Sequence, residues 1–232
     1  MNLTPAQLAA ALDSTNLRLD ASAADIVALC REAAAHRFAC VMIYPGSVAL
    51  AAKELAGTGL KIGTVIGFPS GRFSTAAKAA EIDAMHAAGA HEVDIVMNYA
   101  ALRDGDIQLV DTELRSLTQR AHANGQLVKI IVETCYLDDT QRLASLRLCE
   151  DAGVEFIKTS TGFGSAGAQA EHLAVWAAAR RGPIQIKASG GIKTLADARK
   201  MMAAGATRLG TSSAAAIVAE LTGGAAASAG GY

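Results

Sequence analysis

The chain contains few of the residues that mark secreted or metal-binding proteins. Its 232 residues include four prolines, one tryptophan and four cysteines, and aromatic residues make up only 4%. Cys30, Cys40, Cys135 and Cys149 form no C-x-x-C pair, which favours free thiols in a cytoplasmic protein over a disulfide framework. The five histidines show no metal-ligand spacing, so we expect no metal site built from side chains.

Neither sign of charge dominates the sequence. There are 21 Lys and Arg against 22 Asp and Glu, a formal net charge of −1, which argues against a nucleic-acid-binding or anionic membrane-binding surface. No run approaches the ~18 large apolar residues of a membrane span. Residues 1–5 also lack the basic and apolar pattern of a signal peptide. We therefore expect a cytoplasmic protein without nucleic-acid or membrane partners.

Short β-branched runs alternate with alanine-rich stretches of helical spacing along the whole chain. The runs cover residues 12–15, 40–44, 61–66, 92–96, 127–132, 155–158, 184–187 and 207–210. Eight strands alternating with helices predict a parallel sheet and, over residues 1–222, a single-domain (β/α)8 TIM barrel. An open doubly wound sheet is the alternative, but its G-x-G-x-x-G turn is missing near the N-terminus. Residues 223–232 form a Gly/Ala/Ser tail ending in Tyr232.

Charged residues occupy strand positions that should point into this barrel. Lys158 and Lys187 lie near the C-terminal ends of the sixth and seventh predicted strands, where barrel active sites form. Asp94 on the fourth strand, Lys129 on the fifth and Asp13 near the first also occupy positions that should point into the barrel. Burying a charge costs several kcal/mol unless it is paired. These residues therefore predict either a structural ion-pair network or a catalytic centre.

Two lysines on neighbouring strands favour the catalytic interpretation. Adjacent strands lie about 4.8 Å apart, so the two ammonium groups repel and each disfavours protonation of the other. A lysine with a pKa near 10.4 is only about 0.04% neutral at pH 7, and lowering that pKa by ~3 units makes a substantial fraction nucleophilic. The pair predicts a Schiff-base lysine that is tuned by a second amine.

Glycine- and hydroxyl-rich segments follow the last three strands. They are Thr159–Gly162, a glycine pair (Gly190 and Gly191) that should open a helix, and Gly210–Ser213. Small residues let backbone N–H groups approach a phosphate, and helix N-termini favour its charge. The loops after strands seven and eight of barrels often bind phosphate. A phosphorylated carbonyl compound is therefore the expected substrate.

With these motifs the chain resembles the deoxyribose-phosphate aldolases of the short bacterial type, essentially end to end. The resemblance rests on residues 65–69, 92–96, 129–134, 156–162 and 187–192. It implies a lyase, namely a class I aldolase without metal or organic cofactor, acting in deoxyribonucleotide catabolism. Such an enzyme reversibly cleaves 2-deoxy-D-ribose 5-phosphate to acetaldehyde and D-glyceraldehyde 3-phosphate. A homodimer is a further expectation from the resemblance.

The resemblance also assigns roles to individual residues. It makes Lys158 the Schiff-base lysine, Lys187 the auxiliary lysine that lowers its pKa, and Asp94, with a water, a proton relay. Tyr232 matches a functional C-terminal tyrosine, and Asp13 and Lys129 are expected to support the charge network. The predicted substrate- and phosphate-binding residues are Thr159, Gly162, Gly190, Gly191, Gly210, Ser212 and Ser213.

The sequence departs from this family pattern at two positions. Phe163 stands where some relatives have lysine, and Ser14 stands where many have histidine. Two other interpretations stay open. One is a different Schiff-base barrel aldolase or a transaldolase acting on a phosphosugar. The other is a non-catalytic phosphosugar-binding barrel in which the lysines serve as counter-charges.

Overall fold

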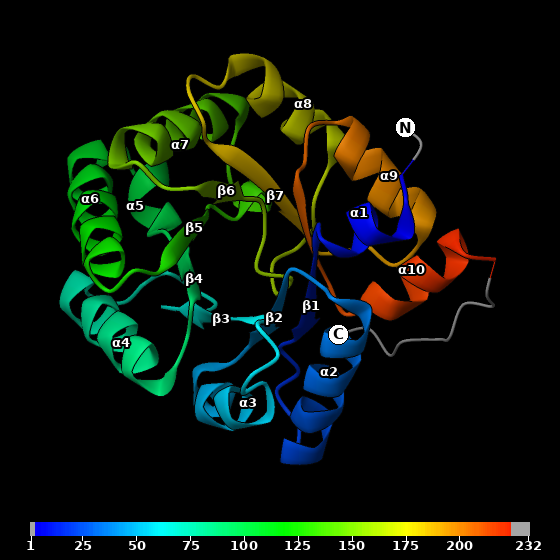
Figure 1. The fold of residues 1–232 in the computed structure, drawn as a ribbon. Coiled ribbons are helices and arrows are strands. Elements are labelled where there is room, and N and C mark those ends of the chain that lie inside the picture. Colours follow the sequence, from blue (N-terminus) through cyan, green and yellow to red (C-terminus); the bar gives the residue numbers. More distant parts are fainter. Residues whose placement is uncertain (1–2, 224–232) are drawn as a thin grey trace.

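The computed structural model describes residues 3–223 and shows a closed barrel of parallel strands inside a layer of helices (Figure 1). Each strand pairs with the next along the chain, and the last pairs with the first. The strands are β1 (Leu12–Asn16), β2 (Cys40–Ile43), β3 (Lys61–Ile66), β4 (Glu92–Val96), β5 (Leu127–Ile131), β6 (Phe156–Lys158), β7 (Gln185–Ser189) and β8 (Arg208–Thr211). The predicted TIM barrel is confirmed, and the open sheet is wrong because β8 closes on β1.

One helix precedes β1, and at least one α-helix follows each strand, as expected for βα units. They are α1 (Pro5–Ala9), α2 (Ala23–His36), α3 (Val48–Glu54), α4 (Thr75–Ala88), α5 (Tyr99–Arg103), α6 (Ile107–Ala123), α7 (Asp139–Ala152), α8 (Ala170–Ala179), α9 (Leu195–Ala203) and α10 (Ala214–Leu221). Two single 3-10 turns, η1 (Pro45–Ser47) and η2 (Thr134–Tyr136), follow β2 and β5. Capping boxes at Ser22 and Thr194 start α2 and α9, since each hydroxyl accepts from the third helical N–H.

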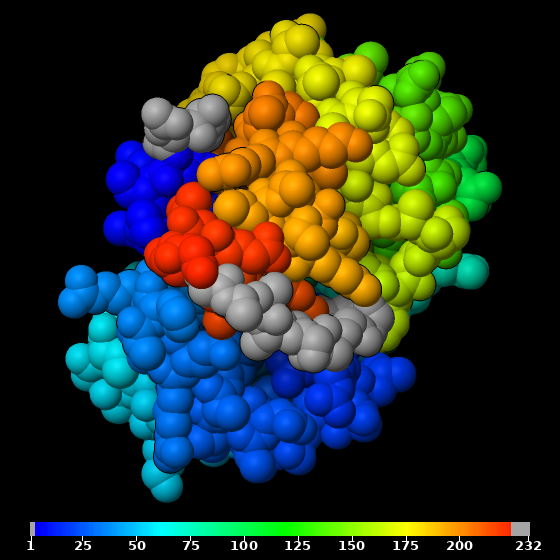
Figure 2. Space-filling model, turned by 90° about the vertical axis from the view of Figure 1, so that its right-hand side faces the viewer, coloured from blue at the N-terminus to red at the C-terminus, as the bar shows by residue number. Residues whose placement is uncertain are grey.

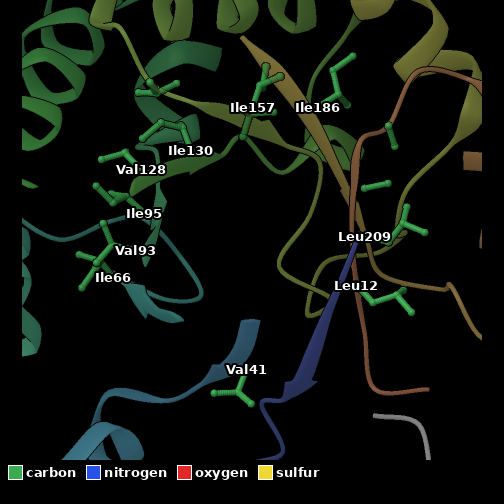
Figure 3. Close-up of a cluster of buried hydrophobic side chains, with 14 of the residues drawn as sticks. Leu12, Val41, Ile66, Val93, Ile95, Val128, Ile130, Ile157, Ile186 and Leu209 are labelled. Atoms are coloured by element: carbon green, nitrogen blue, oxygen red, sulfur yellow. The ribbon is translucent and has the colours of Figure 1, made fainter. Parts of the chain in front are cut away.

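Alternation along the strands separates two environments. Outward residues such as Val41, Ile95 and Ile157 are fully buried against the helices (Figure 3) and belong to one large apolar core. The inward residues include a small apolar cluster of Leu17, Cys40, Met42 and Val65. The remaining inward positions of several strands carry buried charges, so the barrel interior is a polar centre inside an apolar shell.

The helix layer closes where the two ends of the described chain meet. In Figure 2, α10 (red) lies between α9 (orange) and the blue N-terminal segment, and it contacts α1, α2 and β1. The helix ends at Leu221. Of the predicted tail, residues 223–232, only Gly223 lies within the described residues. The tail therefore stays a prediction.

Candidate active site

Lys158 is the last residue of β6, and its side chain is only 3% exposed. Strand pairing places it directly beside Lys187 of β7. Both ammonium groups donate to the same oxygen, Asp94 Oδ2, at 2.6 Å from Lys158 and 2.8 Å from Lys187. The structure thus brings the two predicted lysines and the predicted relay carboxylate together.

The Asp94 carboxylate binds three ammonium groups at once. Its second oxygen, Oδ1, accepts from Lys129 Nζ at 2.8 Å. Burial alone would raise the pKa of Asp94, but Lys129, Lys158 and Lys187 hold it well below its ordinary value. Asp94 is therefore ionised at neutral pH and can accept hydrogen bonds from groups that enter the barrel mouth.

Burial is the largest cause that lowers the pKa of Lys158, from 10.5 to about 8. The Asp94 carboxylate opposes this shift, whereas Lys187 and then Lys129 reinforce it. With a pKa near 8, about a tenth of Lys158 is the free amine at pH 7. The repulsion expected between Lys158 and Lys187 acts in the predicted direction, but it ranks below burial because a carboxylate lies between the two ammonium groups.

Asp13 connects β1 to this cluster. Its Oδ2 lies 2.5 Å from Lys187 Nζ and 4.0 Å from Lys129 Nζ, and its Oδ1 accepts from Arg208 Nη1 at 2.8 Å. Burial would raise the pKa of Asp13, yet Lys187, Lys129 and Arg208 together lower it to about 2. The structure therefore places Asp13 and Lys129 in a charge network, as the sequence predicts.

A cavity opens beside Lys158 at the C-terminal mouth of the barrel. Its lining includes loop glycines, hydroxyl groups and the end of β8. Five of the predicted binding residues line it, namely Gly162, Gly190, Gly191, Gly210 and Ser212. The cavity thus combines the buried Lys158 amine with glycine backbone and hydroxyl groups, which suit a small phosphorylated carbonyl compound.

The glycine pair reaches the cavity through its backbone conformation. Gly190 and Gly191 have φ angles of +83° and +79°, which disfavour any other residue. A Cβ on Gly190 would also lie 2.9 Å from Gly167 Cα. The prediction that this pair opens a helix is wrong, because α9 begins later, at Leu195. The pair belongs to a tight loop ahead of that helix.

Two predicted binding residues, Thr159 and Ser213, do not line this cavity, and their binding roles stay predictions. Thr159 Oγ1 donates to the carbonyl of Ser189 at 3.2 Å and accepts from its N–H at 3.1 Å, so it joins β6 to β7. Ser213 is the N-cap residue of α10, and its N–H donates to Thr211 Oγ1 at 2.9 Å. Both residues support the loops that the cavity residues belong to.

Phe163 follows Gly162 in the loop after β6. Its ring packs edge-on against Phe68 at 5.4 Å between centroids, and Phe68 packs in the same way against Tyr44 at 5.6 Å. This loop therefore brings an aromatic ring and backbone groups, rather than an ammonium group, to the mouth of the barrel.

The sequence reasoning assigned no role to Glu133, which follows β5. Its carboxylate accepts from the Thr161 N–H at 3.3 Å and from the Thr161 hydroxyl. Glu133 has a φ of +55°, an uncommon value for a residue other than glycine. Since Thr161 lines the cavity, Glu133 holds the loop after β6 in place through this contact. No sequence pattern indicated this contact.

Glu92 and Arg208 are two further charged residues of the barrel interior that received no role. Glu92 begins β4 and contacts Lys129 Nζ at 2.6 Å, and Arg208 begins β8 and contacts Asp13. The signal for both was present in the sequence. Glu92 lies two residues before Asp94, and Arg208 lies in the inward phase between Thr207 and Leu209.

Asp13, Cys40 and Glu92 hold potential metal-ligating atoms within 4.8 Å of one another. Both carboxylates are already ion-paired, Asp13 with Lys187 and Glu92 with Lys129. A metal ion would have to displace these ammonium groups, so the three residues fit it poorly. A reaction without metal or cofactor remains a prediction from the resemblance.

Three sequence-based expectations concern other parts of the chain. Tyr232 lies outside the described residues, so its role stays a prediction. All four cysteines are free thiols. Within residues 3–223, no helix reaches the length and apolar character that crossing a membrane requires.

Comparison with known proteins identifies the family. The model of the DeoC/LacD family aldolases matches residues 8–220. A deoxyribose-phosphate aldolase from Bacillus cereus (strain AH187) is 44% identical over 211 residues, which cover 91% of this chain and 94% of the relative. A solved structure from Coccidioides immitis superposes with a TM-score of 0.91 and 36% identity, over 95% of this chain and 87% of that chain.

A tetrameric deoxyribose phosphate aldolase from Aeropyrum pernix superposes with a TM-score of 0.89 and 31% identity, over 94% of this chain and 92% of that chain. The similarity thus extends over almost the whole barrel in both sequence and structure. The chain belongs to the DeoC/LacD family of aldolases.

Proposed function

We propose that this chain is a class I aldolase that reversibly cleaves 2-deoxy-D-ribose 5-phosphate to acetaldehyde and D-glyceraldehyde 3-phosphate. The observation that carries the proposal is the buried Lys158 amine at the barrel mouth, whose pKa is lowered to about 8. A free amine at neutral pH is what imine formation requires. The names of the family relatives that cover this chain almost completely agree with this activity.

In the cleavage direction, Lys158 Nζ adds to the C1 carbonyl of the open-chain sugar. Loss of water from the addition product leaves a protonated imine, in which the nitrogen carries a positive charge. The ionised Asp94 carboxylate, 2.6 Å from Nζ in the free enzyme, stabilises this charge. Burial disfavours the lysine ammonium, but the iminium can still form because the Asp94 carboxylate lies beside it.

The bond that breaks is C2–C3, because acetaldehyde retains C1 and C2. The C3 hydroxyl loses its proton, the C2–C3 electron pair moves toward the iminium, and an enamine remains on Lys158 as glyceraldehyde 3-phosphate leaves. Asp94, directly or through a water, accepts the proton, and the ammonium of Lys187 lies 2.8 Å from the same carboxylate. A proton then returns to C2, and hydrolysis of the iminium releases acetaldehyde and Lys158.

The phosphate group would lie at the glycine loops, away from the reacting carbon. Gly162, Gly190, Gly191 and Ser212 line the same cavity as Lys158. Backbone N–H groups in glycine loops approach phosphate oxygens closely, and the start of α10 directly follows Ser213. Lys158 and these loops therefore define the two ends of one substrate site.

Trapping of the covalent intermediate tests the proposal. Borohydride reduction in the presence of 2-deoxy-D-ribose 5-phosphate should attach the C1–C2 fragment or the whole sugar to Lys158, as peptide mass spectrometry would show. Lys158→Leu should lose both trapping and turnover while keeping the barrel fold, whereas Lys53→Leu, an exposed change on α3, should keep both. Turnover by Lys158→Leu, or no adduct at saturating substrate, would refute the assignment.

Donor profiling separates this function from the other enzyme interpretation. Acetaldehyde should serve as donor in the synthetic direction, and dihydroxyacetone should not. Activity with dihydroxyacetone alone would instead favour a transaldolase-like enzyme. We also infer, from the resemblance, a homodimeric enzyme of the cytoplasm, which sedimentation analysis and cell fractionation would test.

A further inference from the structure

Six charged side chains inside the barrel form a closed ring in which carboxylates and cations alternate. The nitrogen–oxygen distances between neighbouring members, beginning with Arg208–Asp13 and ending with Glu92–Arg208, are 2.8, 2.5, 2.8, 2.8, 2.6 and 3.5 Å. We call this set the charge ring. In order, its members are Arg208, Asp13, Lys187, Asp94, Lys129 and Glu92, which contacts Arg208 again.

The charge ring is electrically balanced. It contains three carboxylates and three cations, and every member contacts two partners of opposite sign. Arg208, at 15%, is the most exposed member, and the other side chains are at most 6% exposed. Buried charges are tolerated when they are paired, and the ring pairs all six groups, although the buried Glu92 Oε2 has ion-pair contacts without a hydrogen bond.

Lys158 stands outside the charge ring. Its ion-pair contact is with Asp94, which already binds Lys129 and Lys187. Lys158 is thus a fourth cation for three carboxylates. Since burial disfavours the ammonium and the ring has no further carboxylate for it, deprotonation of Lys158 makes the six ring members and Lys158 neutral together.

Glu92 and Arg208 complete the charge ring at the end far from the substrate. They are the first residues of β4 and β8, whereas Lys158 is the last residue of β6. Arg208 also lies over the Phe156 ring, 5.3 Å from its centroid, which fixes its position. Neither residue lines the cavity, so any effect on the reaction passes through the ring.

We propose that Glu92 and Arg208 are positioning residues for the aldolase reaction, which keep the charge ring neutral and so leave Lys158 as the uncharged amine. This inference rests on the proposed function, because it assigns the Schiff base to Lys158. Two titratable groups outside the ring also face the cluster. They are Cys40, a thiol that burial keeps neutral, and Glu133, whose pKa burial raises and whose carboxylate accepts from Thr161 and interacts with the charge of Lys158.

Opposite changes in ring charge test the inference. Glu92→Gln leaves the ring with one excess positive charge, so Lys158 should lose its proton more readily. The acid limb of the pH profile, where kcat/KM rises with pH, should then move to lower pH. Arg208→Met leaves one excess negative charge and should move the limb to higher pH. A unit charge about 10 Å away, at an effective dielectric constant of about 20, shifts a pKa by about one unit, or about tenfold in kcat/KM on the limb.

Two further variants separate this role from general destabilisation. Glu113→Gln removes a buried carboxylate outside the barrel, where it pairs with Lys78 at 2.9 Å, and should leave the acid limb in place. Arg208→Lys retains the positive charge and should restore most of the wild-type profile. A general loss of stability would not move the acid limbs of Glu92→Gln and Arg208→Met in opposite directions.

The outcomes distinguish this inference from the proposed function. If wild-type protein forms no reducible adduct at Lys158, the proposed function fails. If the adduct forms but Glu92→Gln and Arg208→Met shift the limb in the same direction, or not at all, the charge-ring inference is overturned. If Arg208→Met does not fold, Glu92→Gln decides alone: a shift to lower pH supports the inference, and an unmoved limb overturns it.

Discussion

Replacing Lys158 by methionine should abolish the reaction and yet stabilise the folded protein at pH 7. Methionine has a similar length and fills the site without charge. Folding lowers the pKa of Lys158 from 10.5 to about 8, and at about 1.4 kcal/mol per pKa unit the folded state disfavours the charged lysine by about 3 kcal/mol. This is a large part of a typical unfolding free energy of 5–15 kcal/mol.

The gain from Lys158→Met should depend on pH in a defined direction. Because the folded pKa lies below the unfolded one, the unfolded chain binds more protons between about pH 8 and 10.5, and wild-type stability rises through that window. The methionine side chain does not titrate, so it makes no such pH-dependent contribution to stability. The variant's advantage in unfolding free energy should be about 3 kcal/mol at pH 7 and fall to about 1 kcal/mol at pH 9.5.

Urea unfolding of both proteins at pH 7 and pH 9.5 measures this difference. Lys53→Met, an exposed change on α3, serves as the control and should alter the unfolding free energy by less than about 0.5 kcal/mol. A methionine variant that is no more stable than wild type at pH 7 would refute the reasoning. So would a gain of the same size at both pH values.

Three other predictions concern groups around Lys158. A Cβ at Gly210 would lie 3.2 Å from Lys187 Cε, so Gly210→Ala should lower kcat on the order of tenfold by displacing that amine, as steady-state kinetics would show. Glu133→Gln weakens the hold on Thr161 and should raise KM for the phosphorylated sugar on the order of tenfold; an unchanged KM would contradict this. Crotonaldehyde should give no Cys40 adduct at neutral pH by mass spectrometry, because burial raises the pKa of this thiol well above its ordinary value.

Much of the fold could be predicted because barrel strands alternate between two environments. Outward residues such as Val93 and Ile157 are apolar, and inward residues such as Asp94 and Lys158 are charged, so a period of two identified both the strands and the central site residues. Strand ends were less certain. The seventh and eighth strands were predicted to end at residues 187 and 210, but β7 extends to Ser189 and β8 to Thr211.

The parts of the site that sequence reasoning missed depend on contacts between distant segments. Thr159 belongs to a hydroxyl-rich loop, but whether its hydroxyl faces the substrate or Ser189 depends on strand register. Glu133, whose backbone adopts a left-handed conformation, contacts Thr161, which lies 28 residues further along the chain. The contact of Arg208 with Asp13 spans almost the whole chain and exists only after β8 has closed on β1.

The central claim is that Lys158 is a buried amine that is uncharged often enough at neutral pH to form an imine. Its most direct test is the pH dependence of the rate at which cyanoborohydride traps the sugar on Lys158, measured by peptide mass spectrometry. The rate should rise about tenfold per pH unit and reach half its maximum near pH 8. A half-maximal rate near pH 10.5, the value of an ordinary lysine, would contradict the claim.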